Sequence, residues 1–289
     1  MNKLDAKALA QILHLLCEGS SIRAVTRLTG ASKNTVTKLL IDAGKACAAY
    51  HDEHVRDLKT RRVQVDEIWS FTYAKQKNVA KAKRQDMAYG DTWTWTAIDA
   101  DSKLMISWFV GGRDGDYALA FMDDLKSRLA NRVQLTSDGH KAYLEAVEGA
   151  FGGDVDYAQL VKLYGASSES AKGRYSPAEC IGAEKHPIEG NPDRKHISTS
   201  YAERQNLNIR MHMRRFTRLT NAFSKKVENH ALAVALFTTY YNFVRIHKTL
   251  RVTPAMAAGV TGKLWEIGDV VKVLEDWENT LAVRRTTSR

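Results

Sequence analysis

The alternation of segment types over residues 63–164 limits the folds open to this chain of 289 residues. The segment VQVDEIWSFTY predicts a strand that carries Asp66 among apolar neighbours, and WTWTAIDADSKLMISWFVG predicts two strands joined by a tight turn. Helical spacing over residues 116–129 follows. VQLTSDGH then predicts a strand ending at Asp138, with a helix over 141–151 and another strand over 157–164. This order indicates one mixed sheet with helices packed on it.

A mixed sheet flanked by helices, with the strands in this order, is the α/β arrangement of a ribonuclease-H-like catalytic domain. Asp66 and Asp138 end neighbouring strands of such a sheet, and we expect them to meet at one edge, where sites in open α/β sheets lie. A carboxylate inside an apolar strand is costly unless it is paired or bound to a cation. An equally open alternative is that Asp66 is a paired structural residue, because Glu67 sits beside it.

A basic run follows a single acid in residues 200–226. Seven Lys or Arg residues and no acid occur from Arg204 to Lys226, and Glu203 stands just before them. Surface helices usually mix charges of both signs, so this run predicts a long basic helix that meets an anionic partner. The alternative for Glu203 is a capping box, with Ser200 as the N-cap three residues earlier.

Three short helices are predicted at the N-terminus, over residues 4–17, 21–30 and 32–44, separated by glycine-containing turns. This arrangement is typical of an all-α helix-turn-helix domain, whose polar residues at the start of the last helix enter the DNA major groove. Here those residues are Lys33, Asn34, Thr35, Thr37 and Lys38. The alternative is a three-helix scaffold that does not contact DNA.

The chain is therefore expected to have three parts. Residues 1–58 form the helix-turn-helix domain, and residues 59–255 form the catalytic domain. Three of the four prolines fall between residues 167 and 200, which predicts a long surface loop inserted in the catalytic domain. Residues 256–289 form a C-terminal helical extension that either covers the domain or mediates self-association.

The charge balance agrees with a polyanionic partner. The formal net charge is +10 and the isoelectric point is about 9.4, which favours binding to phosphates. No stretch is long and apolar enough to suggest a membrane span, and no signal peptide is evident, so a cytoplasmic location is expected. The three cysteines are far apart, which argues against a zinc ribbon or a disulfide framework.

Three motifs resemble the catalytic blocks of insertion-sequence transposases that carry a DDE triad. They are VDEIW with Asp66, TSDGHKAY with Asp138 and AERQNLNIR with Glu203. The last block, with its basic run and the segment 223–227, is most similar to transposases of the bacterial insertion sequence 1 family. The resemblance spans residues 63–254. A zinc-binding cysteine cluster found near the N-terminus of relatives is missing here.

The resemblance implies metal-dependent DNA cleavage and strand transfer by a two-metal mechanism. It implies two Mg²⁺ ions, which Mn²⁺ can replace, with Asp66 bridging both, Asp138 holding one and Glu203 the other. Other residues are expected to assist as follows. The DNA phosphates would be held by Arg204, Arg210 and Arg214. The alternative for Arg204 is an ordinary surface charge that does not contact DNA. His140 and Tyr143 would orient DNA or support their loop, and Asn206 would fix Glu203 or contact the backbone.

The expected partners are double-stranded DNA, both transposon ends and target, and a second copy of the chain in a dimer or higher oligomer assembled on DNA. No membrane partner is expected, and the protein is expected on the bacterial nucleoid when bound. Two other functions stay open. The chain could be a ribonuclease-H-like nuclease that cuts without joining, or a DNA-binding regulator derived from a transposase.

Overall fold

Three helices begin the chain in a computed structural model that describes residues 4–81, 88–165, 180–217 and 221–287. They are α1 (Ala6–Cys17), α2 (Ile22–Thr29) and α3 (Lys33–His54). The side chains of Ser21 and Ser32 accept hydrogen bonds from backbone N–H groups of the first turn and so cap α2 and α3. Gly30, with φ of +73°, ends α2 in the left-handed conformation. The predicted helices are present, and their reading as a helix-turn-helix stays a prediction.

Helix α3 is longer than the sequence indicated. We expected it to end at Gly44 and a separate polar helical connector to follow over residues 45–62, but α3 continues without a break to His54. Gly44 is buried where α3 crosses α7 (Val227–Thr239), and a Cβ atom there would lie 2.4 Å from the backbone oxygen of Leu232. The glycine therefore permits a close helix crossing and does not end the helix.

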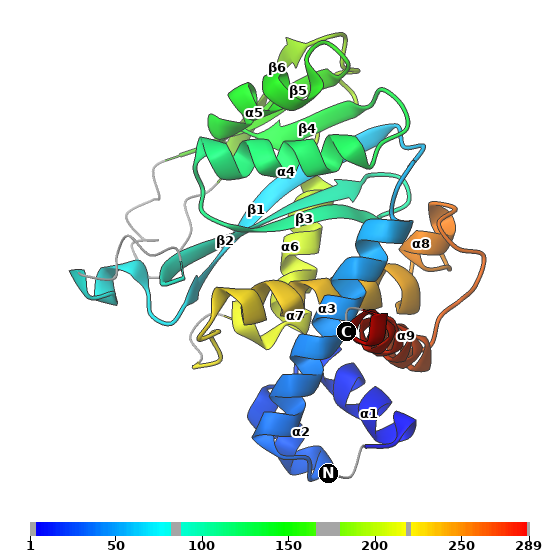
Figure 1. Ribbon diagram of the computed structural model, residues 1–289. Coiled ribbons are helices and arrows are strands. Elements are labelled where there is room, and N and C mark those ends of the chain that lie inside the picture. The colour runs from blue at the N-terminus through cyan, green and yellow to red at the C-terminus, as the bar shows by residue number, and fades with distance from the viewer. Residues whose placement is uncertain (1–3, 82–87, 166–179, 218–220, 288–289) are drawn as a thin grey trace.

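The centre of the molecule is a six-stranded mixed sheet in the order β3-β2-β1-β4-β5-β6 (Figure 1). The strands are β1 (Arg62–Thr72), β2 (Gly90–Asp99), β3 (Met105–Gly111), β4 (Gln134–Asp138), β5 (Asp156–Tyr164) and β6 (Cys180–Glu189). The first three strands are antiparallel neighbours, β4 runs parallel to β1, and β5 runs parallel to β4. The predicted ribonuclease-H-like α/β fold is confirmed by this order.

Strand β6 corrects one expectation. The segment 167–200 was expected to be a surface loop, but residues 180–189 pair antiparallel with β5 and extend the sheet. Residues 166–179 lie outside the part of the chain that the structure describes. The prolines misled the prediction, because Pro187 lies in the outermost strand of the sheet, where proline is tolerated.

Helices cover both faces of the sheet (Figure 1). On one face lie α4 (Gly115–Ser127) and α5 (Ala142–Phe151), which connect β3 to β4 and β4 to β5. On the other lie α6 (Ser200–His212) and α7, which contact β1, β2 and β3. The remaining elements are two 3₁₀ turns at Gln76–Asn78 and Arg214–Phe216, a π-helical turn at Tyr240–Val244, α8 (Pro254–Ala257) and α9 (Ile267–Thr287).

The N-terminal helices do not form a core of their own. One connected apolar cluster includes Leu13 on α1, Val36 on α3, Trp95 in the sheet and Leu274 on α9. Helix α3 packs on both α7 and α9, so the chain ends beside the helices with which it begins (Figure 1). The boundary expected at residue 58 therefore coincides with no break in this core. Within the described ranges, no helix combines the length and apolar character needed to cross a membrane.

Candidate functional site

Strand β1 presents two adjacent acids to opposite faces of the sheet, because successive side chains of a strand alternate. Glu67 pairs with Trp95 and faces α5, where the Tyr143 hydroxyl donates to it at 2.9 Å. Asp66 faces α6, where the side-chain amide of Asn206 donates to its Oδ2 at 2.8 Å. Asp66 Oδ1 accepts a second hydrogen bond, from the backbone N–H of Glu67 at 2.8 Å.

Helix α6 is fixed on β1 by two side-chain contacts on either side of Glu203. The Gln64 side-chain oxygen accepts from the N–H groups of Tyr201 at 2.7 Å and Ala202 at 3.3 Å, which satisfies two free donors of the first turn. One turn later, Asn206 bonds to Asp66. Glu203 lies between these contacts, so the fold brings the third acid of the predicted triad to the face that carries Asp66.

Asp138 stands beside Asp66 at the end of β4. Gln64 pairs with Thr136, so Asp66 and Asp138 follow two residues later on neighbouring parallel strands. Asp138 Oδ1 accepts from the backbone N–H of His140 at 3.0 Å, which holds the turn after the strand. Carboxylate oxygens of Asp66, Glu67 and Asp138, one from each, all lie within 4.8 Å of one another.

Glu67 is the member of this cluster that sequence reasoning did not assign to the site. Its side chain is 1% exposed, and Arg113 donates to its Oε1 from Nε at 2.8 Å and Nη2 at 2.6 Å. The Tyr143 hydroxyl donates to Oε2 of Glu67. Tyr143 is fully buried, so it is inaccessible to DNA. Arg113 also stacks over the Trp93 ring at 4.4 Å. The only sequence signal was an acid in an apolar strand, and nothing marked Arg113 as its partner.

His140 lies on the Glu67 side of the cluster. Its Nδ1 accepts from the backbone N–H of Ala142 at 3.1 Å, so in the neutral ring the proton sits on Nε2, which is 3.9 Å from Glu67 Oε1. Its ring centroid lies 5.9 Å from that of Trp95. Tyr143 thus bonds Glu67 directly and His140 lies beside it, while their expected role in orienting DNA or supporting the loop stays a prediction.

The crowding of acids changes the protonation of Asp66. Burial, and then the charges of Glu67 and Asp138, raise the pKa of Asp66 to about 7, against the lowering effect of the Glu67 N–H. A cation near Asp66 would favour the ionised form instead.

The oxygen atoms around Asp66 are suitable ligands for a hard divalent cation. Asp66 and Asp138 keep oxygen lone pairs free of protein donors, whereas Glu67 is held by three N–H or O–H groups. The Asn206 side-chain oxygen, on the amide that bonds Asp66, is buried and has no partner among the described residues. Carboxylate and amide oxygens are the ligands that Mg²⁺ and Mn²⁺ prefer. The expectation that Asn206 fixes Glu203 is wrong, because Asn206 bonds to Asp66.

Glu203 itself is engaged elsewhere. Lys162 on β5 donates to Oε2 at 2.6 Å, and the Thr199 hydroxyl donates to Oε1. Thr199, and not Ser200, is the N-cap residue of α6, and it makes no side-chain cap to the backbone. The capping box expected from Ser200 and Glu203 is therefore not formed.

The residues expected to contact DNA lie in two separate places. At the start of α3, Lys33, Asn34, Thr35 and Lys38 are exposed and Thr37 is half-buried, with Lys38 paired to Asp42. On α6 and just after it, Arg204 and Arg214 are exposed and Arg210 is half-buried.

The predicted long basic helix is wrong, since α6 ends at His212. One of its arginines, Arg215, is half-buried and donates to Ser224 Oγ at 2.8 Å and to the Asn229 carbonyl at 2.6 Å. Burial lowers the pKa of Arg215 to about 10. At this position the basic run therefore makes hydrogen bonds within the protein, whereas the neighbouring Arg214 is exposed at the surface.

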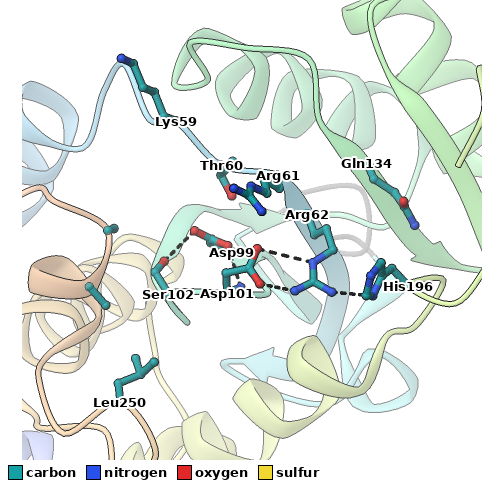
Figure 2. A pocket seen from close by; sticks show the side chains of 12 residues that line it. Lys59, Thr60, Arg61, Arg62, Asp99, Asp101, Ser102, Gln134, His196 and Leu250 are labelled. Carbon is teal, nitrogen blue, oxygen red and sulfur yellow. Dashed lines mark hydrogen bonds and ion pairs between the residues drawn. The ribbon is translucent and has the colours of Figure 1, made fainter. Parts of the chain in front are cut away.

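A hollow of about 710 Å³ lies at the start of β1, and Figure 2 shows the side chains around it. Arg62 is ion-paired with Asp101 and donates to Nδ1 of His196. Asp99 accepts from Ser102 at 2.7 Å on the same wall. No acid of the cluster around Asp66 lines this hollow. Arg62 and Asp101 are paired with each other, and among the described residues no cluster of carboxylates lines the hollow, so the carboxylate cluster around Asp66 is the stronger candidate site.

Comparison with known proteins gives no match to a family model and no match among curated proteins. Solved structures that it finds include a piggyBac transposase synaptic complex with hairpin DNA, at 8% identity and a TM-score of 0.39, covering 95% of this chain and 71% of that one. A Mos1 strand transfer complex is 13% identical with a TM-score of 0.24, covering 82% and 78%, and a pre-cleavage Mos1 transpososome is 11% identical with a TM-score of 0.21, covering 54% and 60%. At these TM-scores the fold assignment rests on the strand order alone, and the structures found are those of transposases.

Proposed function

We propose that this chain is a DNA transposase of the bacterial insertion-sequence type, similar to the insertion sequence 1 family, that cuts and joins DNA at a DDE site. The observation that supports this most is the position of Asp66 and Asp138. Both keep oxygen lone pairs that no described residue occupies, and they stand side by side where Gln64 and Asn206 dock the helix that carries Glu203. A ribonuclease-H-like sheet with acids at this edge suits metal-assisted phosphodiester chemistry.

Asp66, Asp138 and Glu203 are the proposed catalytic residues and would hold two Mg²⁺ ions, which Mn²⁺ can replace. When bound, the metal ions activate the attacking water or 3′-hydroxyl and offset the charge on the leaving oxygen. The protein supplies the geometry: Asn206 fixes the orientation of Asp66, and the His140 N–H fixes that of Asp138. Glu67, paired with Arg113 and bonded by the Tyr143 hydroxyl, links β1 to the segment after β3 and to α5.

The proposed DNA contacts come from the two exposed groups of basic and polar residues. Arg204, Arg210 and Arg214 would hold phosphates near the scissile bond, and the start of α3 would read the transposon ends in the major groove. Strand transfer needs two ends held together, so we expect a dimer or higher oligomer on double-stranded DNA. The expected location is the cytoplasm, on the nucleoid.

The test is a strand-transfer assay with the full chain, a labelled duplex bearing the element's own ends and a plasmid target, with Mg²⁺ or with EDTA. Glu203→Gln should abolish joined products and keep DNA binding, because a metal ligand is lost while the basic surfaces remain. Asp66→Asn and Asp138→Asn should do the same. Glu145→Gln is the matched control, since it removes one exposed carboxylate on α5, on the opposite face of the sheet.

Other results of the strand-transfer assay would each lead to a different function or site. Metal-dependent cutting without joined products would replace the transposase by a nuclease. Binding of the ends with no chemistry under any condition would replace it by a DNA-binding regulator. Full activity of the Glu203→Gln protein would remove Glu203 from the site.

A further inference from the structure

Both carboxylate oxygens of Glu203 are occupied by protein donors. The Lys162 ammonium lies 2.6 Å from Oε2, and the Thr199 hydroxyl donates to Oε1. Glu203 is accordingly absent from the acids whose oxygens lie within 4.8 Å of one another, although α6 is docked directly on Asp66. The third acid of the proposed site is thus held by a cation that belongs to the protein.

Lys162 is placed to compete with a metal ion. Asp138 pairs with Leu160 on the neighbouring strand β5, and Lys162 follows two residues later, so Lys162 and Asp138 project from the same face of the sheet. That face is the one on which α6 lies. The ammonium therefore sits between the end of β5 and α6, next to the edge where the carboxylates gather.

We propose that Lys162 and Thr199 form a latch that holds Glu203 outside the carboxylate cluster, and that Glu203 completes the site by exchanging the Lys162 ammonium for a divalent cation. This inference rests on the proposed metal site. No covalent bond changes, and in this scheme the Glu203 side chain moves from Lys162 to the metal ion. Lys162 is a positioning residue in this scheme, because it acts through Glu203.

The strength of the latch is set by its exposure. The side chains of Lys162 and Glu203 are 34% and 40% exposed, and ion pairs of this kind contribute about 0.2–1 kcal/mol. Such a contact is strong enough to set the resting position of Glu203 and weak enough for a divalent cation to displace. Water can solvate the released ammonium. Removing the latch should therefore tighten metal binding by roughly 1.4- to fivefold.

The test measures Mn²⁺ affinity of the DNA-free full chain, by calorimetry or by the paramagnetic resonance of free Mn²⁺. Lys162→Gln removes the ion pair, and Thr199→Val removes the other donor with no change of charge. Lys185→Gln is the matched control. Lys185 pairs with Leu160 and so lies two strands from Asp138 on the same face, but its ammonium donates to the Arg194 carbonyl and not to Glu203.

We expect Lys162→Gln and Thr199→Val to bind Mn²⁺ more tightly than the wild type, and Lys185→Gln to match the wild type. Adding Glu203→Gln to Lys162→Gln should cancel the gain, since the latch acts only through Glu203. Equal gains in both lysine variants with none in Thr199→Val would overturn the latch in favour of simple charge repulsion. Unchanged affinity in Lys162→Gln would also overturn it while leaving the metal site intact. If the wild type binds no Mn²⁺, the proposed function fails first and the latch with it.

Discussion

At the scale of single residues, His230 shows how the interior responds to pH. It is fully buried on α7, with its two ring nitrogens 3.2 Å from the hydroxyls of Ser70 and Ser224. Burial, and then the charge of Arg215, lower the pKa of His230 to about 3. The unfolded chain binds the proton with an ordinary pKa of about 6.5, so stability is complete above that pH and is lost as the pH falls towards 3.

Titration of His230 alone should lower the free energy of unfolding of the protein by about 2 kcal/mol between pH 7 and pH 5. Urea unfolding at the two pH values measures it. His230→Gln should show a smaller difference between the two pH values, because glutamine does not titrate. The exposed His186→Gln should keep the wild-type difference. A His230→Gln protein with the full wild-type difference would show that other groups cause the acid sensitivity.

At the scale of elements, the crossing of α3 and α7 depends on Gly44. Alanine in place of glycine usually stabilises a helix by about 1 kcal/mol. Here the added Cβ would lie 2.4 Å from the Leu232 oxygen and 2.9 Å from its carbonyl carbon. We therefore expect Gly44→Ala to lower the free energy of unfolding, by about 1–3 kcal/mol for an overpacked site.

The matched substitution is Gly268→Ala in α9, where nothing lies within 4 Å of the added Cβ. Its free energy of unfolding should stay equal or rise. Thermal unfolding of both variants measures these changes in stability. A stabilised Gly44→Ala protein would mean that α3 and α7 are further apart than the 2.4 Å contact of the added Cβ atom implies.

At the scale of the whole molecule, one apolar core joins the N-terminal helices, the sheet and α9. Tyr50 on α3 contacts the rings of Phe243 at 5.6 Å and Trp265 at 5.1 Å between centroids. Arg128 ties α3 to α4 by bonding Asp124 and the Val55 carbonyl. A core shared in this way should unfold in one cooperative step.

The test is Leu13→Ala, which truncates a fully buried side chain on α1 far from the sheet in sequence. We expect a loss of about 2–5 kcal/mol and faster hydrogen exchange at the amides of β1 and β4. Leu28→Ala on α2, where the side chain is 64% exposed, should leave the free energy of unfolding and the hydrogen exchange of β1 and β4 unchanged. Unaltered exchange in the sheet of Leu13→Ala would mean that residues 1–58 unfold independently.

Much of the candidate site could be read from the sequence. Asp66 and Asp138 were predicted to meet because each is an acid in or at the end of an apolar strand, and the two strands are neighbours in a ribonuclease-H-like sheet. Glu203 came from the resemblance to a family. Its partner Lys162, the Asp66–Asn206 bond and the Glu67–Arg113 pair could not be predicted, because each joins residues on separate elements.

The sequence by itself determined the order of strands and helices over residues 62–164 and the placing of Asp66 and Asp138 in neighbouring strands, because periodicity acts over a few residues. Only the tertiary structure decided that α3 passes through Gly44, that residues 180–189 complete the sheet and that Arg215 bonds Ser224 and the Asn229 carbonyl. These features depend on contacts between distant segments. A glycine at a helix end and a glycine at a helix crossing are identical in sequence, and packing alone distinguishes them.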